Sequence, residues 1–494
     1  MYNEFPYVFI IQGVNMIINW KPNRDSDKSL YDQIYNYIIN QISNGDWYID
    51  SRLPSERKLA EAMEVNRSTI SNVLDELKSE GVLISRGSKG TFVANNTWSI
   101  LASTSQPNWK KYLDQGIHKP NQTTIQMINK YEFEDGMIRL GTGEISTDLF
   151  PTEYVNEIMS NITLNSLNYE EPLGYKPLRE AICKYLSKFD IELKPEQVLI
   201  VSGSLQALSL ISIGLLQPGS TVFVEKPSYL KSLHIFQSAG MKLKEILMDE
   251  DGIDLNDLRK KLNKSGTNML YTIPTFHNPT GIVMNESKRK QLMEIIKEFQ
   301  LPVIEDDAYA DLWFSKAPPK PLKSMDDSGS VLYTGTLSKS FSPGLRIGWI
   351  AGSESVIERL GDIKMQTDYG SSSISQLIAF EWFDKGYHER YQIGLKSSLK
   401  SKCKLVLELL STHFSDIAKW QKPNGGFYIW VTLKKDINMF KLFEDALKSK
   451  LLINPGYIYD FNENNSIRLS IAYATGSELE YGIRKLSEII RKYY

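Results

Sequence analysis

The feature that most limits the possible folds of this 494-residue sequence is an alternation of short β-rich runs with amphipathic segments after about residue 138. Helix-like stretches such as Leu205–Leu215 and Glu286–Phe299 separate several of the β-rich runs. Strands and helices that alternate in this way build a mostly parallel sheet with helices packed on it. The β-rich runs are Val198–Val201, Val222–Glu225, Met269–Ile273, Val303–Asp306, Val331–Thr334 and Ile347–Ala351.

Length and composition define the broad class of the protein. A chain of 494 residues is too long for a single core, so we expect two or more domains. With 41% hydrophobic residues, 23% charged residues and a net charge of -2, the composition is that of an ordinary soluble protein. Two cysteines cannot make a disulfide framework, and the five histidines show no ligand spacing, so we expect a cytoplasmic protein without a metal. The partly apolar first fifteen residues are too short to span a bilayer and lack a basic leader.

The amino-terminal segment predicts three helices followed by a hairpin. Apolar residues recur every four positions from Leu30 to Ile42, a second helix follows Ser55, and a third has apolar residues from Ile70 to Leu77. Residues 82–93 are two short apolar runs around a glycine-rich basic turn, which indicates a β-hairpin. Two helices around a short turn, followed by such a hairpin, are typical of a winged helix-turn-helix.

Residues 28–95 contain a series of short motifs: Leu53-Pro54-Ser55-Glu56-Arg57, Leu59-Ala60, Val65-Asn66-Arg67-Ser68-Thr69, Glu80-Gly81, Gly87 and Gly90-Thr91-Phe92-Val93. With these motifs the segment resembles the winged-helix domain of the GntR superfamily. The resemblance implies that double-stranded DNA is contacted by Arg57, Arg67, Ser68, Thr69, Arg86 and Gly87. Ser71 stands where many relatives carry a basic residue. Residues 25–93 hold eight Lys or Arg against eleven Asp or Glu, so one copy should bind DNA weakly and a homodimer is expected.

Residues 96–134 are predicted to be a linker. The segment is polar and its hydrophobic periodicity fades, as in the run Ser103-Thr104-Ser105-Gln106-Pro107. Its aromatic residues Trp98, Trp109 and Tyr112 could dock onto a neighbouring surface.

The residues suited to chemistry follow the predicted strands of the third segment, residues 135–494. Sites in open α/β sheets lie at the carboxyl ends of strands. Lys339 follows one strand among hydroxyls and glycines, and a lysine shielded there can react with an aldehyde. Thr336, Ser338 and Arg346 could bind a phosphate of the same ligand. Ser204 and Leu205 begin a predicted helix after Gly203, where free amide groups also suit a phosphate.

Three further strand ends carry polar or aromatic side chains. Tyr229 could stack on a flat ring, and Asn278 lies in an Asn-Pro-Thr-Gly turn. A carboxylate such as Asp306 can keep a pyridine nitrogen protonated, so that the ring withdraws electrons. Asp307 is the alternative carboxylate, although the spacing to Tyr309 favours Asp306.

This third segment resembles the class I aminotransferases, which have the fold type I architecture and bind pyridoxal 5'-phosphate. The matching features include Gly143, Tyr169, Gly174-Tyr175, Gly425-Gly426-Phe427 and Ile467-Arg468-Leu469-Ser470. By this resemblance Lys339 is the Schiff-base lysine, and Asp306 pairs with the pyridine nitrogen. Asn278 and Tyr309 take the phenolic oxygen, and Tyr229 takes the ring face. The phosphate ligands implied are Ser204, Leu205, Thr336, Arg346 and, from the neighbouring subunit, Tyr169. Gly143 and Arg468 contact the substrate or effector, with Arg468 on its carboxylate.

A GntR-type winged helix joined by a linker to such a domain resembles the MocR/GabR family of bacterial transcriptional regulators. The resemblance implies a dimer whose large domain senses an amino compound through pyridoxal phosphate. A working aminotransferase with an accessory DNA-binding domain is the alternative, because every residue needed for the early chemistry is present. A structural dimer without cofactor is disfavoured by the joint presence of Lys339, Asp306 and Arg346.

Overall fold

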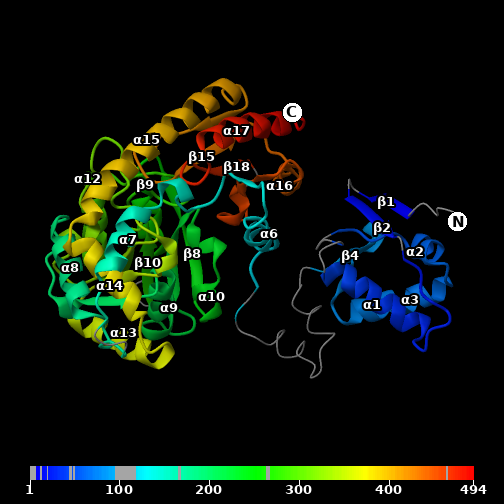
Figure 1. The fold of residues 1–494 in the computed structure, drawn as a ribbon, viewed down its shortest axis with the longest axis horizontal. Helices are drawn as coiled ribbons and strands as arrows, with labels where there is room; N and C mark the ends of the chain where they lie inside the picture. Colours follow the sequence, from blue (N-terminus) through cyan, green and yellow to red (C-terminus); the bar gives the residue numbers. More distant parts are fainter. Residues whose placement is uncertain are drawn as a thin grey trace. The chain divides into compact units, whose positions relative to one another are not determined.

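The structure, a computed structural model, describes residues 7–11, 14–18, 20–43, 47, 51–94, 118, 120–164, 168–262, 267–462 and 465–494; the side chains of residues 7–17 and 43 are outside this description. The chain forms two compact units, Met1–Thr123 and Thr124–Tyr494 (Figure 1). The predicted α/β fold class, with a winged helix at the amino terminus and a mostly parallel sheet after it, is confirmed.

The small unit contains the predicted helix-turn-helix. Its helices are α1 (Leu30–Ser43), α2 (Glu56–Met63) and α3 (Arg67–Ser79). Ser55 caps α2, because its hydroxyl accepts a hydrogen bond from the Lys58 amide, and α2 ends at Glu64 in the left-handed conformation. The apolar side of α3 is buried against α1 and α2 through Ile70, Val73, Leu74 and Leu77.

The predicted wing is present and has an additional extended segment. Strands β3 (Leu83–Ser85) and β4 (Thr91–Val93) pair antiparallel around the short helix η1 (Gly87–Lys89). Residues 51–53 pair with the other side of β4: the Leu53 amide donates to Thr91 O at 2.9 Å, and the Val93 amide donates to Ser51 O at 3.0 Å. A separate antiparallel hairpin, β1 (Tyr7–Ile11) and β2 (Val14–Ile18), precedes α1.

The large unit is built on an eight-stranded sheet of order β6-β13-β12-β11-β10-β7-β8-β9. Strand pairs are parallel except at β13, which runs antiparallel to both its neighbours, and at β8-β9. The strands are β6 (Val198–Val201), β7 (Thr221–Lys226), β8 (Lys242–Asp249), β9 (Gly252–Ile253), β10 (Asn268–Thr272), β11 (Val303–Asp306), β12 (Val331–Thr336) and β13 (Gly348–Ala351).

Helices cover both faces of this sheet, because strands such as β6, β11 and β12 are buried on both sides. Within β6, Leu199 packs with α9 and α13, whereas Val198 and Ile200 pack with α8 and α14 on the opposite face. The helices of this layer are α7 (Thr152–Asn161), α8 (Lys176–Ser187), α9 (Ser204–Gly214), α10 (Ile235–Ser238), α11 (Leu255–Lys261), α12 (Glu286–Phe299), α13 (Glu354–Thr367) and α14 (Ser373–Asp384). Short helical turns are η2 (Thr147–Leu149), η3 (Pro195–Gln197), η4 (Tyr229–Ser232), η5 (Leu322–Met325), η6 (Pro343–Leu345) and η7 (Gly456–Ile458). Within the described part of the chain, no helix combines the length and apolar character needed to cross a bilayer.

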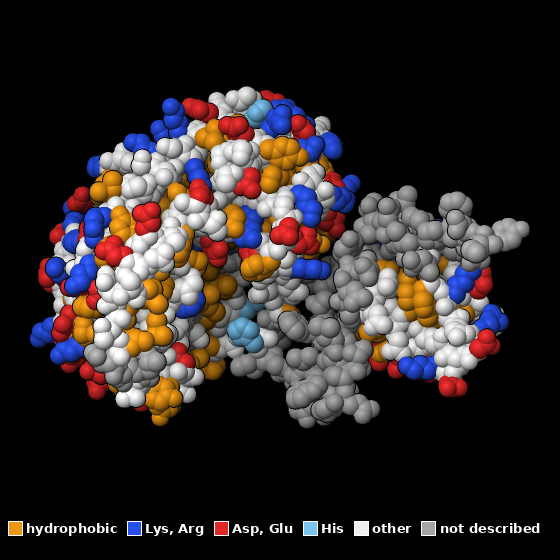
Figure 2. Space-filling view, in the orientation of Figure 1, with side chains coloured by type: hydrophobic (Ala, Val, Ile, Leu, Met, Phe, Trp, Pro, Cys, Tyr) orange, Lys and Arg blue, Asp and Glu red, His pale blue; other side chains and the backbone are white. Residues whose placement is uncertain are grey.

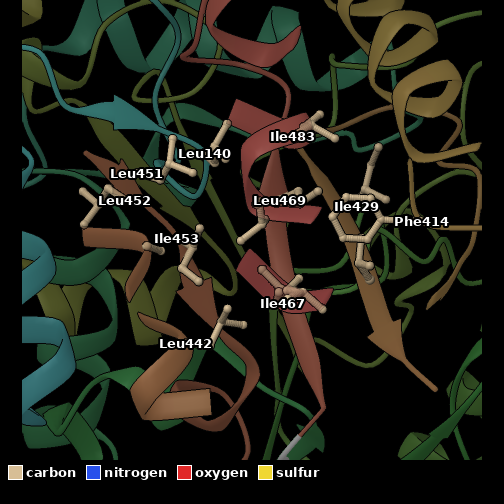
Figure 3. Packing of buried hydrophobic residues seen from close by; sticks show 14 of the residues in the cluster. Leu140, Phe414, Ile429, Leu442, Leu451, Leu452, Ile453, Ile467, Leu469 and Ile483 are labelled. Atoms are coloured by element: carbon tan, nitrogen blue, oxygen red, sulfur yellow. The ribbon is translucent and has the colours of Figure 1, made fainter. Parts of the chain in front are cut away.

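A second sheet forms the carboxyl-terminal part of the large unit. Its core is shown in Figure 3, where Ile467 and Leu469 of β18 lie between Leu452 and Ile453 on one side and Ile429 and Phe414 on the other. The strands are β14 (Ala418–Trp420), β15 (Tyr428–Leu433), β17 (Asn454–Pro455) and β18 (Ser466–Ser470), with β5 (Ile138–Arg139) pairing with β16 (Leu451–Leu452) beside them. The helices are α15 (Tyr387–His413), α16 (Met439–Lys448) and α17 (Gly476–Arg491).

The end of the predicted linker belongs to the large unit. Helix α6 (Thr123–Tyr131) lies within residues 96–134, yet its Ile128 is buried in the core of the second sheet. The Thr124 hydroxyl also shares a hydrogen bond of 2.7 Å with the Tyr457 hydroxyl. The helix was not predicted, because the stretch is polar overall and only a narrow apolar stripe of the helix is buried. Trp98, Trp109 and Tyr112 lie outside the described residues.

Candidate functional site

The predicted chemical residues meet at one edge of the large sheet. Strands β10, β11 and β12 are parallel and in close register, with Thr272 opposite Glu305 and Asp306 opposite Thr334. Their carboxyl ends therefore lie side by side. Because β13 runs in the opposite direction, it starts at the same edge, two residues after Arg346.

A cavity of about 290 Å³ opens at this edge. Predicted site residues that line it are Gly143, Ser204, Leu205, Tyr229, Asn278, Asp306, Tyr309, Lys339, Arg346 and Arg468. Thr336 and Tyr169 do not line it. A larger cavity of about 1330 Å³, beside α15 and η5, contains none of the predicted site residues.

Lys339 projects its amine into this cavity. The Nζ atom donates a hydrogen bond to Gly143 O at 2.6 Å. A Cβ on Gly143 would lie 2.3 Å from the Tyr428 hydroxyl and 3.7 Å from Lys339 Nζ, so a glycine is required for this close approach. The amine is therefore held by a wall that leaves little space around it.

Asp306 is the carboxylate that faces the cavity. Its Oδ2 accepts a hydrogen bond of 2.7 Å from the Tyr271 hydroxyl, and its Oδ1 accepts one of 3.3 Å from the Ala308 amide. Burial raises the pKa of Asp306, whereas these hydrogen bonds and the charge of Lys339 act in the opposite direction. Asp307, the alternative carboxylate, accepts from the Tyr333 hydroxyl at 3.0 Å and does not line the cavity.

Positive charge and free amide groups gather where α9 begins. Gly203 has a φ of +84°, and a Cβ there would lie 2.5 Å from Arg346 Nη2. Arg346, itself left-handed with a φ of 54°, donates from Nη2 to Ser202 O at 2.7 Å. The first turn of α9 and the guanidinium therefore face the same end of the cavity, an arrangement that suits an anion.

Thr336 lies behind this anion-binding end. Its hydroxyl is 3.0 Å from both Ile347 O and Ser338 Oγ, and the Ser338 amide donates to it at 3.1 Å. Ser338, rather than Thr336, lines the cavity. The geometry therefore makes Thr336 a positioning residue for Ser338, and its direct phosphate contact stays a prediction.

Arg468 closes the opposite end. It is 5% exposed, and its guanidinium lies 4.0 Å from the centre of the Tyr428 ring and 4.8 Å from that of Tyr459. Nη1 donates to Asn278 Oδ1 at 2.8 Å and Nη2 donates to Gly141 O at 2.7 Å, while Nε has no hydrogen-bond partner. A buried guanidinium with an unused donor is suited to a carboxylate.

Several residues of the site were missed by the sequence analysis. Tyr271 was not singled out, because it lies within the apolar run of β10 and meets Asp306 only when β10 pairs with β11. Tyr428 directly follows Gly425-Gly426-Phe427, and its hydroxyl lies 3.1 Å from that of Tyr309. Other lining residues that had not been singled out as site residues are Ile128, Glu132, Gly141, Thr142, Glu144, Ile273, Ala308, Pro343 and Asn454.

The predicted DNA-contacting residues lie on the surface of the small unit. Arg57, Ser68 and Arg86 are exposed, and Thr69 is half-buried. The Arg67 side chain is 71% exposed and forms an ion pair of 3.2 Å with Glu56. The Arg86 guanidinium lies 4.7 Å from the centre of the Phe92 ring, and Gly87 has a φ of 58°. Arg52, which was not predicted, lies against Gly90 of the wing. Basic and acidic side chains are interspersed on the visible surface of this unit (Figure 2).

Comparison with protein families assigns both parts of the chain. Residues 135–486 match the family "aminotransferase class I and II", and residues 30–93 match "bacterial regulatory proteins, gntR family". This chain is a gntR-family regulator with an aminotransferase domain. Its MocR-type architecture, expected from the sequence, is thereby confirmed.

Relatives of this regulator match it over nearly their whole length. The HTH-type transcriptional regulator YisV of Bacillus subtilis is 48% identical over 96% of this chain and 98% of its own. The HTH-type transcriptional regulator NorG of Staphylococcus aureus is 33% identical over 89% of this chain and 100% of its own.

Solved structures match the aminotransferase domain. Pyrococcus horikoshii kynurenine aminotransferase has a TM-score of 0.73 and 33% identity, covering 80% of this chain and 99% of its own. LysN, an α-aminoadipate aminotransferase of Thermus thermophilus, complexed with N-(5'-phosphopyridoxyl)-L-leucine, has a TM-score of 0.70 and 28% identity over 77% of this chain and 96% of its own.

The cofactor of this domain family is pyridoxal 5'-phosphate, and the site of the regulator fits it. Lys339 offers an amine for the aldehyde, and Asp306 offers a buried carboxylate for a ring nitrogen. The first turn of α9 with Arg346 offers an anion site, made possible by the close approach at Gly203. Among the described residues, no group of three or more His, Cys, Asp or Glu is arranged to hold a metal ion.

Proposed function

We propose that the regulator controls transcription from the cytoplasm as a homodimer, and that it senses an amino compound through pyridoxal phosphate bound at Lys339. The observation that carries this proposal is that one cavity contains an amine, a buried carboxylate and a buried arginine with a free donor. These are the groups needed to bind an aldehyde cofactor and an amino acid together.

Each residue has a distinct task in this proposal. When bound, pyridoxal phosphate supplies an aldehyde that reacts with amines and a ring that withdraws electrons. Asp306, stabilised by Tyr271, holds a proton on the ring nitrogen, and Tyr229 covers the ring face. Ser204, Leu205, Ser338 and Arg346 bind the phosphate, with Thr336 supporting Ser338. Asn278 and Tyr309, which also line the cavity, would bind the phenolic oxygen.

The effector is recognised at the other end of the cavity. Gly143 allows the close approach of the cavity wall to the Lys339 amine, which accepts and releases protons as effector binds and leaves. Arg468 binds the effector carboxylate, and its two existing hydrogen bonds and two aromatic neighbours hold it in place. An effector that binds one of two conformations of the protein more tightly would shift the population toward that conformation. If the two conformations bind DNA differently, the DNA affinity would change.

Exposed aromatic and apolar residues support the homodimer. Tyr169 is 78% exposed and Tyr369 is 56% exposed, with their ring centres 4.9 Å apart. Met159 of α7 and Ile374 of α14 are also exposed, and hydrophobic side chains are visible on the face that carries these helices (Figure 2). We propose that this face meets the second subunit, and that Tyr169 reaches the phosphate of that subunit.

The test compares Lys339→Ala with Lys400→Ala. Lys400 is an exposed lysine that lines the larger cavity, so its replacement should leave cofactor binding unchanged. Each protein is mixed with pyridoxal phosphate, reduced with borohydride and weighed by mass spectrometry. Binding to DNA selected from a random pool is then measured by fluorescence anisotropy, with and without a panel of L-amino acids.

We expect Lys339→Ala to lose the covalently bound cofactor and the effect of amino acids on DNA binding, while its basal DNA binding remains. The Lys400→Ala protein should behave as the wild type does. If Lys339→Ala still responded to amino acids as the wild type does, the sensing role of the site would be wrong.

A second candidate function is transamination, with the small unit as an accessory DNA-binding domain. The complete residue set of the cavity and the similarity to kynurenine aminotransferase favour it. Product formation with a keto-acid acceptor and DNA affinity would be measured on one preparation at fixed salt. Rapid multiple turnover without specific DNA binding would support the enzyme and contradict the regulator.

A further inference from the structure

Two carboxylates lie in the wall of the cavity next to the Lys339 amine. Glu144 follows Gly143, whose carbonyl accepts the hydrogen bond from Lys339, and Glu132 follows the end of α6. Both side chains are half-buried and line the cavity. Among the described residues, neither carboxylate has a hydrogen-bond or ion-pair partner on its side chain.

Glu132 and Glu144 are near enough to repel one another. The pKa of Glu132 is raised by burial and then by repulsion from Glu144, while Arg139 acts in the opposite direction. The Arg139 guanidinium itself lies 4.4 Å from the centre of the Tyr473 ring and 5.9 Å from that of Phe133. For Glu132 the repulsion from Glu144 outweighs the attraction of Arg139, so a ligand that brings a further positive charge to this wall would be stabilised.

An independent observation also points to a ligand at this wall. Thr142, adjacent to Gly143, is 8% exposed and lines the cavity, yet its hydroxyl has no hydrogen-bond partner. Arg468 is 5% exposed, and its Nε atom also has no hydrogen-bond partner. Buried polar atoms without partners are rare in folded proteins, and a polar ligand would satisfy both.

We propose that the effector is a diamino acid, whose distal ammonium group binds between Glu132 and Glu144. Its carboxylate lies at Arg468, and its α-amino group lies where the Lys339 amine meets Gly143. The inference rests on the proposed function, because it names the class of amino compound that the same cavity selects. Neutral and acidic amino acids of equal length lack the charge that the two carboxylates would bind.

The experiment uses full-length protein loaded with pyridoxal phosphate. Three pairs of L-amino acids are titrated while the visible absorption of the cofactor is recorded: 2,4-diaminobutyrate with 2-aminobutyrate, ornithine with norvaline, and lysine with norleucine. Within a pair the carbon chain is the same, so the ratio of dissociation constants isolates the distal ammonium. Isothermal calorimetry gives the same ratios without relying on the cofactor spectrum.

For at least one pair we expect the diamino acid to bind about tenfold or more tightly, as two partly buried ion pairs imply. Glu132→Gln and Glu144→Gln should each lower that ratio by about threefold to fivefold, while the constant for the neutral partner changes little. Glu294→Gln is the matched control, because Glu294 is an exposed carboxylate of α12 outside the cavity lining.

The outcomes separate this inference from the proposed function. If both members of every pair shifted the spectrum with equal affinity, the preference for a diamino acid would be overturned and the proposed function would stand. If no amino acid or diamino acid shifted the spectrum, both would fail. A preference that persisted unchanged in Glu132→Gln and in Glu144→Gln would also overturn the assignment to these carboxylates.

Discussion

The two units of this protein present their functional residues in opposite ways. In the large unit, Asp306 and Arg468 are each 5% exposed. Asp306 accepts a hydrogen bond from Tyr271, and Arg468 donates hydrogen bonds to Asn278 and Gly141. In the small unit, the Arg67 side chain is 71% exposed, and Glu56 is its ion-pair partner. Ligand binding by a buried cluster depends on its packing, whereas DNA binding by an exposed cluster depends on the number of charges and on the salt concentration. Single substitutions should therefore have large effects in the large unit. In the small unit their effects should be small and additive.

The largest effect is expected for Gly141→Ala, because a Cβ there would lie 2.0 Å from Asn454 Oδ1. The Gly141 carbonyl also accepts from Arg468, so displacement of Gly141 moves the arginine. We expect the free energy of unfolding of the large unit to fall by about 1–3 kcal/mol. Effector affinity should fall as well. Urea unfolding and effector titration measure the two effects.

Gly394→Ala in α15 is the control for this change. Gly394 is an exposed helical glycine, and a Cβ there would meet nothing within 4 Å. Since alanine favours a helix over glycine, stability should rise by about 0.5–1 kcal/mol. Equal effects of the two substitutions would contradict the view that the cavity wall is tightly packed.

The next effect is the pH dependence of stability that arises from the buried acids Glu305 and Asp307. Burial and the charge of Asp307 raise the pKa of Glu305 to about 7, and burial raises the pKa of Asp307 to about 6, with Arg289 opposing both shifts. Both folded-state values exceed the ordinary values of 4.5 and 3.8, so the folded state binds more protons than the unfolded state. The stabilisation from this pair is complete below about pH 4 and is lost as pH rises through about 6 to 7.

Asp307→Asn should flatten this pH dependence. An asparagine can still accept from the Tyr333 hydroxyl while removing one buried negative charge. We expect the variant to be more stable than the wild type by about 1–2 kcal/mol at pH 8 and little different at pH 4. Thermal unfolding at a series of pH values measures this difference. A pH-independent difference would show that the two acids are not coupled as described.

The smallest effects are expected on the DNA-binding surface. Arg67→Ala should weaken DNA binding by about threefold to tenfold and lower the slope of log affinity against log salt by about one. Glu56→Gln should act in the opposite direction, by about twofold, because it releases Arg67 from its ion pair. Fluorescence anisotropy between about 50 and 200 mM salt measures both. An effect of Arg67→Ala that did not change with salt would indicate a buried contact instead.

The same contrast explains what could be predicted from the sequence. Strand β11 and helix α12 were predicted with their observed bounds, because a buried parallel strand is a continuous apolar run and α12 has one apolar side. Most predicted cofactor residues line one cavity, because motifs at the ends of parallel strands must meet at one edge.

Contacts between distant segments could not be predicted from the sequence. Glu132 lies in what the composition indicated was a linker, and Asn454 comes from a strand of the second sheet. The pairing of residues 51–53 with β4, which brings Arg52 to the wing, also joins segments about forty residues apart. No local pattern encodes such contacts, since they depend on how sheets and helices close around a core.

Helix α6 belongs both to the wall of the cavity and to the start of the large unit. The large unit begins at Thr124 within α6, where the Thr124 hydroxyl shares a hydrogen bond with Tyr457, Ile128 borders the cavity and Glu132 follows one turn later. A ligand that displaced this wall of the cavity would also displace the helix with which the large unit begins. Under the proposed function, α6 would then be the first element of the large unit to register an occupied site.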